Sequence, residues 1–193
     1  RDTVQRLLME GRAGKSADAV RGLRKVFGQA ADPKVRAQVV ATIGALGVQG
    51  MDLQEIVRAG LRDAQPQVRI QALRAAEHGA SKAMGKLFLA LVLGVERDPE
   101  FTVRRQLAFT LGELRGGEAE GEAMQALARM ADREGANEQM RLAVLSSLKP
   151  NDASFAKFNA APAGRDVQGQ KFSLPPGSPD RATTTCGTRS ATR

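Results

Sequence analysis

The sequence predicts an all-α fold, a right-handed superhelix of stacked helical hairpins, and three observations lead to this prediction. An arginine returns about every 35 residues, at Arg1, Arg36, Arg69, Arg104 and Arg141. Apolar residues recur three and seven positions after each arginine, which is the spacing of one helix face. Short segments with Asp, Pro or Gly separate the apolar stripes. A repeat of this length indicates hairpins that bury their apolar faces only against their neighbours.

The first predicted element is half a hairpin. Arg1, Val4 and Leu8 occupy the positions of a second helix, but no first helix precedes them, so residues 2–10 form an N-terminal half-repeat. A hairpin cut in half exposes the apolar face that its mate would cover. We therefore expect the chain to be a piece of a longer protein.

Two complete hairpins are predicted next. In the first, the stripe that ends at Phe27 is followed by the turn Asp32-Pro33 and by a second helix that ends at Gly47. In the second, Asp52 and Glu55 have the spacing of a capping box. Pro66 then opens a helix that Gly79 ends, as expected from the preference of proline for the first turn and glycine for the end.

The third and fourth hairpins complete the series of four. In the third, a buried helix stops near Gly94, and Asp98-Pro99 open a helix that Gly116-Gly117 end. In the fourth, one stripe runs from Met124 to Ala131 and the next from Met140 to Leu148. The predicted helical stack therefore occupies residues 1–149.

The period fails after Leu148. Pro150 and Asn151 allow a short helix over residues 150–160, with Phe155 and Phe158 on it. Residues 161–193 are rich in Pro, Gly, Ser and Thr and almost lack apolar side chains. Such a segment cannot offset its ordering entropy by burial, so we predict a disordered low-complexity tail.

The periodic arginines are interpreted as structural. An acid or Asn precedes four of them by four to six residues, as Asp63 precedes Arg69 and Asp98 precedes Arg104. The guanidinium offers several donors in a fixed plane and can bind the carboxylate of its own turn. Stacked units would then place these pairs in a ladder, and a basic stripe for phosphates is the alternative.

The sequence offers no catalytic, cofactor-binding or metal-binding residues. A single histidine and a single cysteine, His78 and Cys186, exclude a multi-cysteine metal site and make a Cys–His dyad implausible. His78 precedes Gly79 and is interpreted as a residue that suits a helix C-terminus. Glutamates 118, 120 and 122 are interpreted as a solvated helix start. We therefore expect no enzyme activity and no cofactor in this chain.

The formal net charge of +8 is interpreted as a solvated surface rather than a nucleic-acid footprint. The segment after residue 160 contributes +3, and acids are interspersed with the bases in the remainder. Trp and Tyr are absent, so few side chains could stack on bases. No apolar run approaches the ~20 residues that cross a bilayer. The sequence thus disfavours nucleic acid as a partner and contains no membrane span.

The Asp-x-x-x-x-Val-Arg pattern at residues 63–69 and 98–104 resembles HEAT repeats, which belong to the armadillo-like α-solenoids. Residues 1–8, 103–114 and 141–148 resemble, more specifically, the HEAT region of haem-binding, membrane-bound dehydrogenase-like proteins of planctomycetes and verrucomicrobia. The period here is shorter than the ~40–47 residues usual for HEAT repeats.

The resemblance implies a scaffold or protein-interaction module within an exported or periplasmic redox protein. In that family a dehydrogenase-like propeller precedes the repeats and a c-type cytochrome domain follows them. The Cys-x-x-Cys-His needed for c-type haem attachment is missing here, since Gly-Thr-Arg-Ser follows Cys186. The resemblance therefore places haem only in a neighbouring domain, and the expected partners are proteins or domains of the same polypeptide. The alternative is a nucleic-acid-binding module with a basic concave face.

Overall fold

The computed structural model describes residues 17–79, 85–114 and 119–149, and these residues form helices and turns without any strand. Eight α-helices and one short 3-10 helix follow one another in this part of the chain: α2 (Ala17–Gln29), α3 (Pro33–Ala45), α4 (Gly50–Leu61), α5 (Pro66–His78), α6 (Gly85–Val92), η2 (Leu93–Val95), α7 (Phe101–Leu114), α8 (Glu120–Glu134) and α9 (Glu138–Ser147). The all-α prediction is confirmed. The predicted half-repeat 2–10, the short helix 150–160 and the tail 161–193 lie outside the described residues.

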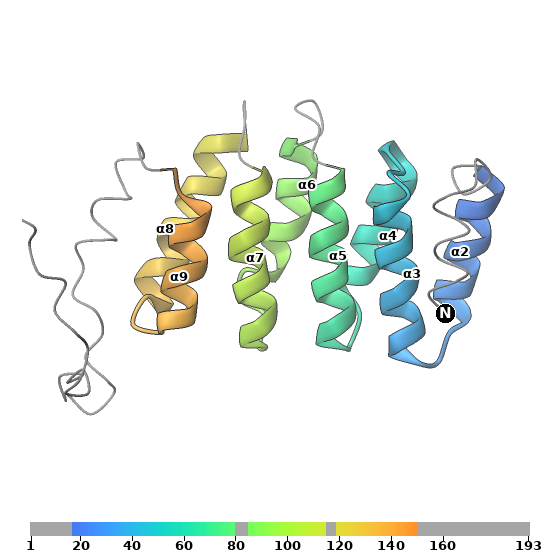
Figure 1. Ribbon diagram of the computed structural model, residues 1–193, viewed down its shortest axis with the longest axis horizontal. Helices are drawn as coiled ribbons and strands as arrows, with labels where there is room; N and C mark the ends of the chain where they lie inside the picture. Colours follow the sequence, from blue (N-terminus) through green and yellow to red (C-terminus); the bar gives the residue numbers. More distant parts are fainter. Residues whose placement is uncertain (1–16, 80–84, 115–118, 150–193) are drawn as a thin grey trace, which may run out of the picture.

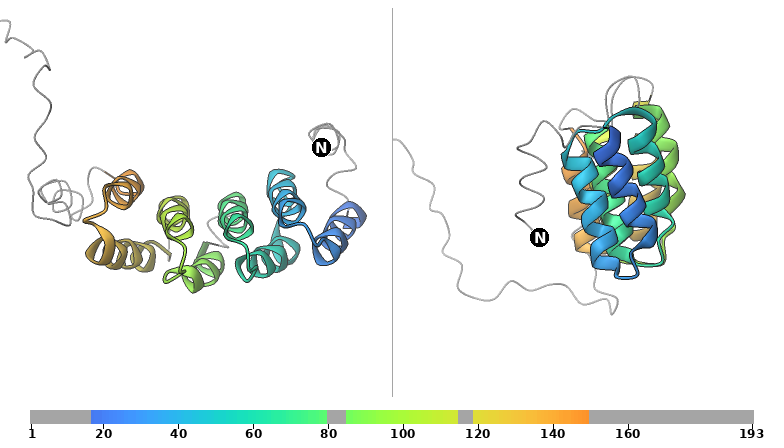
Figure 2. Two further views of the ribbon diagram at one scale, coloured as in Figure 1. Left: turned by 90° about the horizontal axis from the view of Figure 1, so that it is seen from below. Right: turned by 90° about the vertical axis from the view of Figure 1, so that its right-hand side faces the viewer.

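The helices lie in two rows (Figure 1). Helices α3, α5, α7 and α9 form one row, and α2, α4, α6 and α8 form the other (Figure 2, left). Packing within the first row is extensive, from α3 to α5, α5 to α7 and α7 to α9, whereas α4 and α6 contact each other little. The rows follow a shallow arc with the α3 row on its inner side (Figure 2, left). The inner row is therefore the tightly packed one.

One continuous apolar core lies between the rows. It includes the apolar residues three and seven positions after Arg36, Arg69, Arg104 and Arg141. The pairs Val39 and Ile43, Ala72 and Ala76, Leu107 and Leu111 are at most 5% exposed. Phe88 of α6 is the largest fully buried side chain in the described residues. Because one cluster runs through all of these helices, each helix depends on its neighbours in the rows for burial.

Two helix starts follow the sequence closely. The Asp32 carboxylate accepts the backbone N–H of Lys34 at 2.8 Å, and Pro33 occupies the first helical position of α3. Asn137 accepts the backbone N–H groups of Gln139 and Met140 and caps α9 in the same way. Each cap satisfies donors that have no partner inside the helix.

Two other predicted helix starts are wrong. Helix α4 begins at Gly50, and the carboxylates of Asp52 and Glu55 bind Arg24 of α2 instead of forming a capping box. Helix α7 begins at Phe101, so Pro99 precedes the helix rather than occupying its first turn. At α4, pairing between neighbouring units thus replaces the local capping pattern.

Candidate interaction surface

Three arginine bridges join consecutive turns along the inner row. They link Arg36 of α3 to Asp63, Arg69 of α5 to Asp98, and Arg104 of α7 to Glu134. In each bridge Nε and Nη2 contact the two carboxylate oxygens at 2.7–3.0 Å. Nη1 donates to two backbone carbonyls five and six positions before the arginine, at 2.6–3.0 Å. One guanidinium therefore closes its own turn and holds the next one.

The expectation that each arginine binds the carboxylate of its own turn is wrong, because the arginine binds a carboxylate of the next unit instead. Arg69 binds the carboxylate of Asp98, 29 residues ahead, whereas Asp63, six residues behind, offers only its backbone carbonyl. Arg104 likewise takes the Asp98 carbonyl and the Glu134 carboxylate. The ladder is thus a chain of contacts between units.

Burial differs among the bridges and sets how strongly each is held. The side chains of Arg69 and Asp98 are 10% and 5% exposed, whereas those of Arg104 and Glu134 are 20% and 18% exposed. The hydrogen bond from Arg36 lowers the pKa of Asp63, because it favours the ionised carboxylate over the neutral acid. The hydrogen bond to Glu134 raises the pKa of Arg104 for the corresponding reason. In both cases the hydrogen bond favours the charged form of the group.

Arg141 occupies the same position at the start of α9, as predicted. Its buried Nε has no hydrogen-bond partner, which is also true of Arg69 Nε, but Arg69 has an ion pair with Asp98 and Arg141 has none within the described residues. Arg1 lies outside the described residues. In the part of the chain that the structure describes, the series of bridges therefore ends at Glu134.

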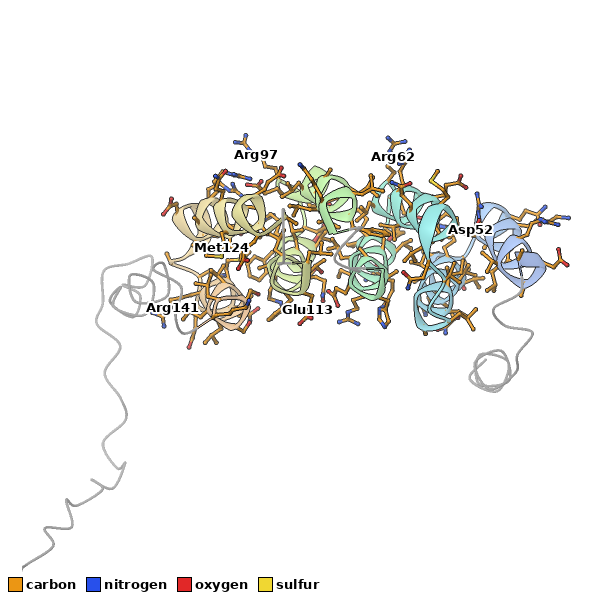
Figure 3. All side chains as sticks on the ribbon, turned by 90° about the horizontal axis from the view of Figure 1, so that it is seen from above. Asp52, Arg62, Arg97, Glu113, Met124 and Arg141 are labelled. Carbon is orange, nitrogen blue, oxygen red and sulfur yellow. The ribbon has the colours of Figure 1, made fainter. Side chains whose placement is uncertain are left out.

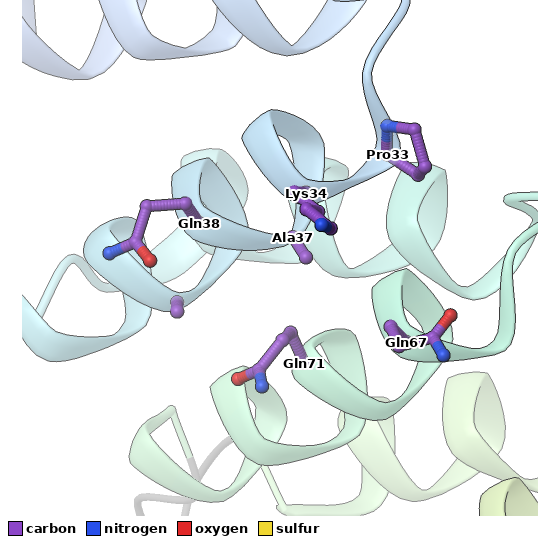
Figure 4. A pocket seen from close by; sticks show the side chains of 7 residues that line it. Pro33, Lys34, Ala37, Gln38, Gln67 and Gln71 are labelled. Atoms are coloured by element: carbon purple, nitrogen blue, oxygen red, sulfur yellow. The ribbon is translucent and has the colours of Figure 1, made fainter. Parts of the chain in front are cut away.

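A first cavity lies on the inner row between α3 and α5, with a volume of about 390 Å³. Figure 4 shows Lys34 and Gln38 from α3 beside Gln67 and Gln71 from α5. Carboxamides both donate and accept hydrogen bonds, so this lining suits uncharged polar groups. Lys34 is the one cationic residue among those that line the cavity.

A second cavity of about 400 Å³ lies where α5, α7 and α9 approach one another. Glu77 and Glu113 line it together with Phe109, whose side chain is unusually exposed for an aromatic residue, at 41%. The Oε1 atom of Glu77 accepts hydrogen bonds from Thr110 Oγ1 at 2.6 Å and from Gln106 Nε2 at 3.2 Å. Burial raises the pKa of Glu77 in spite of these two donors, and the charge of Glu113 raises it further.

Unpaired arginines gather on the opposite, outer row. Arg58 and Arg62 line a cavity of about 290 Å³ between α4 and α6. Figure 3 shows Arg62 and Arg97 projecting from one edge of the molecule and Glu113 at the other edge. The nearby Arg129 and Arg133 differ, because both bind Glu96 and lower its pKa to about 2.

The remaining residues singled out from the sequence have structural settings. His78 is the last residue of α5, as expected, and its Nδ1 lies 2.9 Å from the Arg74 carbonyl oxygen. Glu120 and Glu122 occupy the first turn of α8, which agrees with the predicted helix start, while Glu118 and Cys186 lie outside the described residues. Among the described residues, no group of three His, Cys, Asp or Glu side chains could hold a metal ion. None of the described helices could span a membrane.

Sequence reasoning missed Glu77, and one signal could have found it. Counting from the periodic arginine, the eighth residue is Gly44 in one unit, Glu77 in the next and Gly112 in the third. A carboxylate at a position that is glycine in the two neighbouring units marks a change in how two helices meet.

Replacement of Glu77 by glutamine tests the cost of this carboxylate. A raised pKa in the folded state means that ionisation opposes folding, so the cost exists above the raised pKa and disappears below the ordinary value of 4.5. We expect Glu77→Gln to raise Tm by about 1–3 °C at pH 8 and to have no such effect at pH 4. Thermal unfolding of wild type, Glu77→Gln and the exposed control Glu138→Gln at both pH values measures this. A gain at pH 4 as large as at pH 8 would contradict the assignment.

No family model, curated protein or solved structure matches the chain.

Proposed function

We propose that this chain is a HEAT-like α-solenoid of four helical pairs, right-handed, that serves as a non-catalytic scaffold for binding other proteins or neighbouring domains. The observation that carries the proposal is the repeated arginine bridge, which fixes each unit to the next in the same way. Stacks built from nearest-neighbour contacts produce extended surfaces for partners. The inner row offers such a surface, with two cavities along it.

The lining of the inner row favours a protein partner. Glutamine carboxamides, two glutamates and an exposed phenylalanine line the two cavities, and these groups complement the backbone and side chains of a polypeptide. A phosphate backbone would instead require a concentration of lysine and arginine. Arg58, Arg62 and Arg97 are exposed, have no ion pair among the described residues, and belong to the outer row or its loops.

The wider context that we propose is an exported redox protein of the dehydrogenase-like, haem-binding kind, in which this stack spaces the catalytic modules. It is supported by the resemblance of residues 1–8, 103–114 and 141–148 alone. The genomic sequence on either side tests it: propeller and Cys-x-x-Cys-His segments support the context, and their absence from the full gene removes it.

Site-specific photo-crosslinking in cells of the source organism tests the scaffold function. The photo-reactive residue p-benzoylphenylalanine replaces Gln71 on the inner row or, as a matched control, the exposed Ala90 of α6 on the outer row. We expect a defined protein adduct from position 71 and none from position 90. The absence of any protein adduct at position 71 would refute the proposal.

Binding of duplex DNA by a basic surface is the alternative function. It is measured by fluorescence anisotropy of a labelled duplex at about 50 and 200 mM salt, because phosphate-driven binding weakens steeply over this range. Tight binding at low salt that is lost at high salt would favour the alternative over the scaffold.

A further inference from the structure

The contact between α5 and α7 is built differently from the equivalent contacts on either side of it. A Cβ atom on Gly44 would lie 3.1 Å from Cα and Cβ of Ala75, and one on Gly112 would lie 2.8 Å from Cβ of Ser147. At the equivalent place between α5 and α7, Glu77 meets Thr110 through a hydrogen bond. A close contact between small residues is thus replaced once, among the described residues, by a half-buried carboxylate.

The carboxylate of Glu77 can accept more hydrogen bonds than the described residues donate to it. Both hydrogen bonds to Glu77 end on Oε1, so Oε2 accepts none from the described residues. An ionised carboxyl group has about four acceptor sites. Glu113, on the wall of the same cavity, is exposed and has neither a hydrogen bond nor an ion pair within the described residues.

The cationic groups nearby are directed elsewhere. Arg74 of α5 donates from Nε to the side-chain oxygen Oε1 of Gln106 at 3.2 Å. The side-chain Nε2 of the same glutamine donates to Glu77. Lys149 lines the cavity, but its Nζ lies 4.0 Å from Glu120 Oε1. His78 contributes a weak favourable interaction with Glu77 and lies against the Arg74 carbonyl. Among the described residues, the two glutamates therefore lack a direct cationic partner.

We propose that the cavity between α5, α7 and α9 binds a positively charged side chain, lysine or arginine, presented by a partner protein. The cationic head lies between Glu77 and Glu113, and the aliphatic stem packs on the exposed ring of Phe109. A volume of about 400 Å³ accommodates one such side chain together with water. The proposal rests on the protein-binding function proposed above and adds the chemistry of the residue that is recognised.

The test uses n-butylguanidinium as the probe and follows backbone amide signals of the ¹⁵N-labelled full chain by NMR. We expect saturable shifts at Phe109, Gly112 and Ser146, which line the cavity. The uncharged analogue n-butylurea should produce none of them. Glu113→Gln should weaken binding about fivefold through the loss of one charge-assisted contact, and Glu138→Gln, which lies outside the cavity, should leave the affinity unchanged.

Acidification supplies a second readout. Protonation of Glu77 removes a negative charge from the cavity, so the affinity for n-butylguanidinium should fall as the pH is lowered through the raised pKa of Glu77. Equal shifts with n-butylurea, or an unchanged affinity in Glu113→Gln, would overturn the proposal. A protein adduct at position 71 without binding of n-butylguanidinium would overturn this site alone, whereas binding without an adduct would retain the cation site and refute the scaffold function.

Discussion

Replacement of Arg69 by leucine is expected to destabilise the protein by about 3–5 kcal/mol, because it leaves one partner of a buried ion pair without the other. The variant removes both contacts to the Asp98 carboxylate and leaves the backbone N–H of Glu100 as its one donor among the described residues. It also removes the donor to the carbonyl oxygens of Asp63 and Ala64. Urea unfolding at pH 7 measures the change in the free energy of unfolding.

A double-mutant cycle shows whether the loss of stability comes from the interaction between Arg69 and Asp98. Asp98→Ala should destabilise by a similar amount, and the double variant Arg69→Leu/Asp98→Ala should be less destabilised than the sum of the two single variants. Arg104→Leu is the matched comparison, with a smaller expected loss of about 1–3 kcal/mol, because Arg104 and Glu134 are more exposed. Additive losses in the cycle would show that the bridge contributes no coupling between units.

Replacement of Gly112 by valine is expected to destabilise the protein by about 2–3 kcal/mol through overpacking between α7 and α9. Any Cβ at this position lies 2.8–2.9 Å from Cβ, Cα and Oγ of Ser147. Rotation of the Ser147 side chain would move only Oγ, whose single proton is shared between the carbonyl oxygens of Ala108 and Ala143, and would leave Cα and Cβ in place. The helices must therefore separate, which thermal unfolding detects as a lower Tm.

The same substitution at Gly22 provides the control. Gly22 lies within α2, and no atom of a neighbouring residue comes within 4 Å of a Cβ built there. Valine and glycine differ by only a few tenths of a kcal/mol in helix propensity, so Gly22→Val should change stability by less than about 0.5 kcal/mol. Equal losses at both positions would show that the backbone, rather than the contact with Ser147, determines the effect of Gly112→Val.

Much of the fold could be predicted from the sequence because its units repeat. The apolar stripe after each arginine predicted the buried faces of α3, α5, α7 and α9, and residues such as Val39, Leu107 and Val144 are buried as expected. The helix caps at Asp32 and Asn137 follow equally simple rules, because each side chain accepts a backbone N–H group only two residues further along the chain. These features depend on residues close together in the chain.

The partners of the arginines could not be predicted, because they depend on how neighbouring units pack. In the sequence, Asp63 is the nearest acid to Arg69, yet the packed helices bring Asp98 within 2.7 Å. The local acid is itself held by the preceding arginine, Arg36. The same competition explains why Asp52 and Glu55 pair with Arg24 instead of capping α4.

The second cavity was also hidden from the sequence. A single glutamate near the end of a helix is ordinarily solvated, and nothing beside Glu77 in the chain indicates burial. Its setting is created by Thr110 and Gln106, about 30 residues ahead, on a different helix. Only an alignment of the units on their arginines places Glu77 opposite Gly44 and Gly112.

The helices of the inner row pack more closely on one another than α4 packs on α6, and this difference should affect how the molecule bends. The inner helices are in close contact and are joined by the arginine bridges, whereas α4 and α6 contact each other little and leave a cavity between them. Elsewhere on the outer side, ion pairs of Arg24 and of Glu96 also join neighbouring units. If the molecule bends, the distance between α4 and α6 should therefore change more than the distances between the helices of the inner row. We therefore expect the spacing of α4 and α6 to vary under tension while the spacing of the inner helices stays constant.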